Sequence, residues 1–117
     1  MSTDKASPFP WPDDAIVRYT AYRAPGPIAV DGHLDKDAWQ RAARSPRFVD
    51  LITGQPTIHD TRAAVLWDDT HLYVGFWVEE PFVEATLTER DSLVWTENDI
   101  ELFIAGRDAY YELELNP

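Results

Sequence analysis

Two pairs of short, β-prone segments, each joined by a brief polar turn, constrain the fold of this chain most strongly. Residues 61–67 and 72–78 form the first pair and are joined by the turn 68–70. Residues 99–105 and 109–115 form the second pair. Valine, isoleucine and aromatic residues, which favour strands, are frequent in both pairs. Connections this short between two strands are typical of β-hairpins, so we expect antiparallel sheet.

Shorter segments extend the predicted sheet on the N-terminal side. Further strand candidates are residues 16–22, 28–30 and 48–52. Apolar residues at helical spacing predict one short helix over 34–42, capped by Asp35. Six or seven short strands with one helix predict an all-β fold, an immunoglobulin-like or jelly-roll-type antiparallel β-sandwich.

The chain has room for one domain. Residues 1–14 are rich in proline and are expected to form an irregular leader, whereas 15–117 form the sandwich domain. Both sheets of a sandwich must cover each other's apolar faces, and 117 residues provide few strands for this. We therefore expect 15–117 to be the N-terminal part of a sandwich, which stops before the fold is complete.

Composition excludes several classes of function. Twenty-one acidic and 10 basic residues give a net charge of −11, which repels the phosphate backbone of nucleic acids. No apolar run approaches the roughly 20 residues of a membrane-spanning helix. The chain has no cysteine, so disulfides, thiolate zinc sites and cysteine nucleophiles are excluded. The N-terminus as written has no signal peptide, which predicts a cytoplasmic location.

Five segments, in this order, resemble the family 9 carbohydrate-binding modules. They are 28–35 (IAVDGHLD) with Ala38 and Trp39, 64–69 (AVLWDD) leading into 72–74 (LYV), Glu80 with Pro81, 95–104 (WTENDIELFI), and 110–117 (YYELELNP). The resemblance covers residues 28–117. It implies a β-sandwich that binds sugars of the glucan or xylan type, including cellulose, without catalysing a reaction.

The resemblance also implies partners and a location. Such modules are accessories of secreted or periplasmic glycoside hydrolases, so a carbohydrate ligand, a further C-terminal segment and a partner catalytic domain are expected. The family can hold a structural calcium, although the sequence itself requires no cofactor and assigns no metal ligands. Asp31, Asp35, Asp37, Asp68 and Asp69 offer oxygens, but turn formation and helix capping also explain them.

The resemblance assigns carbohydrate-binding roles to four residues. Trp95 matches the first of the family's two sugar-stacking tryptophans, and Glu101 matches an acidic residue that hydrogen-bonds sugar. Glu112 and Glu114 stand where the best-known type has Arg and Asn. Sugar rings pack their C–H groups on aromatic rings while carboxylates accept hydrogen bonds from hydroxyls. The three glutamates are expected to converge if the strands 99–105 and 109–115 pair.

Two alternatives remain for the same residues. Trp95 can be a half-buried packing residue and the glutamates a solvated strand face, in which case the chain is a structural or protein-interaction domain. Glu112 and Glu114, about 7 Å apart on one strand face, also have the separation of the two carboxylates of an inverting glycosidase. No catalytic residue is predicted on the principal interpretation.

Overall fold

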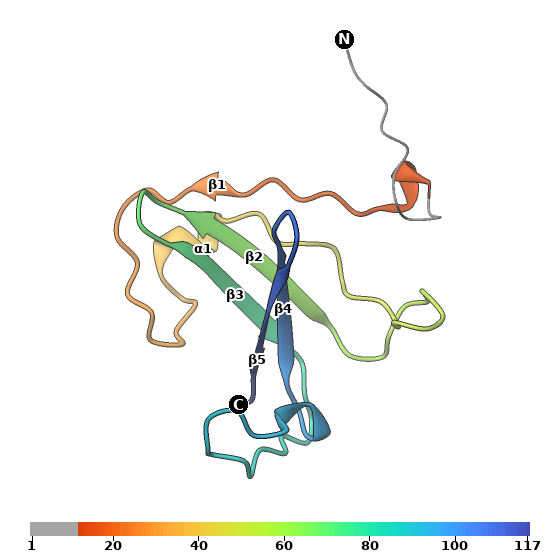
Figure 1. Cartoon of the computed structure of the whole chain (residues 1–117). Helices are drawn as coiled ribbons and strands as arrows, with labels where there is room; N and C mark the ends of the chain where they lie inside the picture. The colour runs from red at the N-terminus through yellow and green to blue at the C-terminus, as the bar shows by residue number, and fades with distance from the viewer. Residues whose placement is uncertain (1–11) are drawn as a thin grey trace. The chain divides into compact units, whose positions relative to one another are not determined.

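The computed structural model describes residues 12–117 and contains mostly strands (Figure 1). The predicted all-β class with one short helix is confirmed, and no helix in the described part of the chain is long and apolar enough to cross a membrane. The elements are η1 (Asp13–Ala15), β1 (Tyr22–Arg23), α1 (Asp37–Arg41), β2 (Thr61–Trp67), β3 (Leu72–Val78), η2 (Val94–Thr96), β4 (Ile100–Ala105) and β5 (Tyr110–Leu115). Most of the predicted leader 1–14 lies outside the described residues.

The strands form two sheets. One has the order β1-β2-β3 and the other consists of β4 and β5. Both predicted pairs of strands are present with nearly the predicted bounds. β1 pairs in parallel with β2, so that Tyr22 lies opposite Leu66 and Arg23 opposite Trp67. This short parallel contact differs from the wholly antiparallel arrangement expected from the hairpins.

Three predicted strands are absent or reduced. Residues 16–22 contribute only the start of β1, and 28–30 form no strand. Residues 48–52 contain one isolated bridge, between Val49 and Pro56. The carboxylate of Asp50 accepts hydrogen bonds from the backbone N–H groups of Ile52 and Thr53. These local bonds hold the segment as a tight loop, because they occupy donors that a strand would need.

The helix is shorter than predicted. α1 begins after Lys36, which provides no side-chain cap, so the prediction that Asp35 caps the helix is wrong. Asp31 provides local hydrogen bonding instead, since its carboxylate accepts from the backbone N–H of His33 and from Lys36 Nζ. The helix ends at Arg41 because Ala42 takes an extended conformation.

The chain divides into two compact units. The first comprises 12–45 and 64–75, and its core consists of Ile28, Trp39, Ala64, Leu66 and Tyr73. The second unit comprises 46–63 and 76–117 and contains the paired strands β4 and β5. All four predicted sugar-binding residues belong to this second unit.

Candidate functional site on the β4–β5 hairpin

The register of β4 and β5 sorts their side chains onto two faces. Ile100 lies opposite Leu115, Leu102 opposite Leu113 and Ile104 opposite Tyr111, so one face of the hairpin is apolar. The other face, called here the acidic face, consists of Glu101, Phe103, Tyr110, Glu112 and Glu114 with Ala105. The predicted convergence of the three glutamates on one face is what this register produces.

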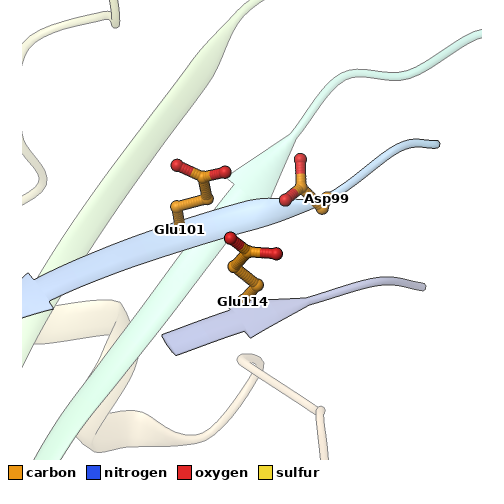
Figure 2. A group of neighbouring side chains, drawn as sticks. All are labelled: Asp99, Glu101 and Glu114. Atoms are coloured by element: carbon orange, nitrogen blue, oxygen red, sulfur yellow. The ribbon is translucent and has the colours of Figure 1, made fainter. Parts of the chain in front are cut away.

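Glu101 and Glu114 lie directly opposite each other. Asp99, two residues before Glu101, adds a third carboxylate at the same end of the hairpin. Each of the three side chains has a carboxylate oxygen within 4.8 Å of the others. Figure 2 shows all three projecting from the same side of the two strands. We refer to Asp99, Glu101 and Glu114 as the carboxylate triad.

The triad is a concentration of negative charge. Desolvation raises the pKa of Glu101, and the charges of Asp99 and Glu112 raise it further. Desolvation, a hydrogen bond with Glu112 and the charges of Glu101 and Asp99 raise the pKa of Glu114. Within residues 12–117 no lysine or arginine forms an ion pair with a triad carboxylate. The described part of the chain therefore does not neutralise this charge.

One oxygen of the triad lacks a partner. Asp99 Oδ2 is buried and forms no hydrogen bond with any described residue. Asp99 and Glu114 are half-buried, whereas Glu101 is exposed.

Trp95 lies in η2, just before β4, and its side chain is 59% exposed. η2 contacts β5, so Trp95 belongs to the same part of the second unit as the acidic face. The exposure leaves most of the indole accessible to a ligand. An indole that mainly filled the core would be more deeply buried.

Side-chain hydrogen bonds fix the segment that carries Trp95. Glu97 accepts from the backbone N–H and the hydroxyl of Thr86, and these bonds lower its pKa. The carboxamide oxygen of Asn98 accepts from the N–H of Glu84 at 2.5 Å. Glu97 and Asn98 were not among the predicted site residues. Their position between Trp95 and the strand, within the segment 95–104 that resembles the family, was the available signal.

Two exposed rings on the acidic face were also missed. Phe103 and Tyr110 are 55% and 64% exposed, and their ring centroids lie 5.9 Å apart. They come from β4 and β5 and occupy the end of the face near the turn 106–108, whereas the triad occupies the opposite end. Strand alternation in the sequence places both rings with the glutamates, so the pattern could have identified them.

Two of the aspartates considered for calcium, Asp31 and Asp68, have other roles. Asp31 forms an ion pair with Lys36 beside the turn at Gly32, which has a positive φ of 77°. Asp68 accepts from the hydroxyl of Tyr73 and from the backbone N–H groups of Thr70 and His71, and these bonds strongly lower its pKa. Both therefore serve the turn chemistry that the sequence also predicted.

No protein-family model, curated protein or solved structure matches this chain.

Proposed function

We propose that this chain is a non-catalytic carbohydrate-binding domain whose ligand lies on the acidic face of the β4–β5 hairpin. The observation that carries the proposal is the register, which puts carboxylates and exposed rings on one face. Phe103 and Tyr110 offer apolar surface to the C–H groups of a sugar ring, and Glu112 and Glu114 accept hydrogen bonds from its hydroxyls. Trp95 offers a further exposed ring in the same unit, on η2, which contacts β5.

The exposure of the face supports binding rather than catalysis. Phe103, Tyr110 and Trp95 are each more than half exposed. Glycoside hydrolysis relies on a site that excludes water and holds the substrate closely. Stacking on an open face contributes about 25 cal/mol per Å² of apolar area buried. We therefore expect affinities in the micromolar-to-millimolar range, typical of sugar binding without a deep pocket.

The charge of the face also limits the class of sugar. The carboxylates of the acidic face have no cationic partner among residues 12–117. Uronic acids, which carry a carboxylate, are repelled. Neutral glucose- and xylose-type sugars fit the arrangement, in agreement with the glucan- and xylan-type ligands that the family resemblance implies.

The test is titration with glucose, xylose, cellobiose, xylobiose and glucuronic acid, followed by NMR chemical shifts and tryptophan fluorescence. We expect saturable changes with the neutral sugars and none with glucuronic acid. Trp95→Ala and Phe103→Ala should each weaken binding by about tenfold, equivalent to about 1.4 kcal/mol. Tyr22→Ala removes an equally exposed ring from the first unit and should leave affinity unchanged. Binding that survives both Trp95→Ala and Phe103→Ala would place the ligand elsewhere.

A protein partner is the second candidate ligand, and the apolar face of the hairpin favours it. Tyr111 and Leu115 on that face are 76% and 61% exposed. Exposed apolar surface of this kind is common at protein interfaces. Folded protein that binds none of the sugars would favour this candidate over carbohydrate.

A further inference from the structure

The outer edge of β5 is a strand edge that no strand within residues 12–117 pairs. At the turn of the hairpin the N–H of Gly106 donates to the carbonyl of Ala109, so these two residues form a hydrogen-bonded pair. Hydrogen-bonded and non-hydrogen-bonded pairs alternate along an antiparallel hairpin. Glu112 and Glu114 both fall in non-hydrogen-bonded pairs, so their backbone N–H and C=O groups point away from β4.

These outward backbone groups are available to a further strand. They form no hydrogen bond with any described residue. The side chains that flank them on the apolar face, Tyr111, Leu113 and Leu115, are exposed. A row of unpaired N–H and C=O groups on an accessible strand is a template for pairing with another polypeptide.

The register of the hairpin determines the sequence pattern that such a strand needs. Residues directly opposite each other on neighbouring strands project from the same face of a sheet. Residues opposite Glu112 and Glu114 would therefore lie on the acidic face, and the residues between them on the apolar face with Leu113. Opposite charges across paired strands are stabilising, which favours lysine or arginine at the first positions and apolar residues at the others.

We propose that the outer edge of β5 binds an extended, antiparallel peptide segment of a partner protein, in which lysine or arginine alternates with apolar residues. Addition of a strand to an open sheet edge is a recurring mode of peptide recognition. The inference does not rest on sugar binding, because the peptide is held by the strand edge and not by the exposed rings of the acidic face.

The distribution of charge selects both the edge and the occupant. The corresponding residues on the outer edge of β4 are Glu101, Phe103 and Ala105, which offer a basic peptide one carboxylate where β5 offers two. A second copy of the chain fits β5 poorly. Antiparallel pairing of two β5 edges would set glutamates against glutamates, and the net charge of −11 adds repulsion between the copies.

The experiment is a titration of the full chain with a synthetic peptide of alternating lysine and valine, capped at both ends and six residues long like β5. The titration contains no sugar, so the failure of either proposal leaves the other standing. We expect saturable NMR shifts at the amides of Glu112 and Glu114, with slower hydrogen exchange at both. A peptide of alternating glutamate and valine should not bind.

Two backbone-methylated peptides distinguish strand addition from attraction by charge alone, and both leave the protein unchanged. Methylation of the lysine amide nitrogens should abolish binding, because in the antiparallel arrangement the N–H groups opposite Glu112 and Glu114 point at β5. Methylation of the valine amide nitrogens should retain binding, since those N–H groups point away from β5. Equal binding of the two methylated peptides would overturn the proposal.

A charge reversal in the protein provides the complementary test. Glu112→Lys should weaken binding of the lysine peptide about fivefold and allow the glutamate peptide to bind, because like charges across paired strands repel and opposite charges attract. Asp35→Lys makes the same change of charge at an exposed position in the first unit and should preserve the preference for the lysine peptide.

Two further outcomes would contradict strand addition. One is folded wild-type protein whose Glu112 and Glu114 amides do not shift at about 1 mM lysine peptide. The other is a shift of the same amides with protein concentration alone, which would assign the edge to a second copy of the chain.

Discussion

Gly75 is the glycine with the least space around it in the first compact unit. A Cβ at this position would lie 3.1 Å from the ring of Trp39 and 3.2 Å from both terminal methyls of Leu34. A Cβ here would force Trp39 or Leu34 to shift by a few tenths of an ångström, because α1 and the preceding loop approach β3 closely. The same contact explains why Trp39 is among the most buried residues of the core.

Substitution of Gly75 tests this packing. We expect Gly75→Ala to lower the free energy of unfolding by about 1–3 kcal/mol, because the added methyl group overfills the space beside Trp39. Gly26→Ala is the matched control, since a Cβ there meets nothing within 4 Å. Urea unfolding of the two variants measures the difference. Equal stabilities would show that the Trp39 and Leu34 side chains move aside without cost.

The β4–β5 hairpin depends on the segment that leads into it, and Asn98 is central to that segment. The Asn98 side chain accepts from the N–H of Glu84 and donates to a Glu80 carboxylate oxygen, while its backbone N–H donates to the Glu84 carbonyl. These bonds connect the start of β4 with the loop after β3. They also fix the approach of η2, which carries Trp95.

Removal of the Asn98 side chain should loosen this connection. We expect the amide hydrogen of Glu84 to exchange about fivefold faster in Asn98→Ala, because a hydrogen bond of about 1 kcal/mol is lost. Sugar affinity should fall in parallel if Trp95 contributes to the ligand surface. Hydrogen exchange measured by NMR reports the first effect, and Thr57→Val, which removes a side-chain donor elsewhere in the second unit, provides the control. Unchanged exchange at Glu84 would contradict this role of Asn98.

The two faces of the β4–β5 hairpin were predictable because its strands alternate strictly. Ile100, Leu102 and Ile104 alternate with Glu101 and Phe103, and this pattern alone determines which side chains share a face. The segment 79–98 has no such period, so the bonds of Glu97 and Asn98 were not predictable. The parallel pairing of Tyr22 with Leu66 joins residues far apart in the sequence, and no local pattern indicates it.

The net charge of −11 acts on the molecule as a whole. Repulsion among the carboxylates destabilises the folded chain. Salt weakens this repulsion, because the screening length falls from about 30 Å at 0.01 M to about 8 Å at 0.15 M. We expect the midpoint of thermal unfolding to rise by a few degrees over this range of sodium chloride, with a chelator present to remove divalent ions. Choline chloride should have the same effect. A midpoint that falls or stays constant would show that repulsion among the carboxylates does not limit the stability of the folded chain.

The two compact units are interleaved along the chain, since each consists of two separate segments. This arrangement has a consequence for synthesis on the ribosome. The first unit contains no residue beyond Gly75, so its core of Trp39, Leu66 and Tyr73 is available for folding as soon as that residue leaves the exit tunnel. The second unit cannot complete its fold until β5 has been synthesised. Until then its early segment 46–63 lacks the residues with which it packs. The nascent chain should therefore acquire its tryptophan-centred core before the carboxylate triad can assemble.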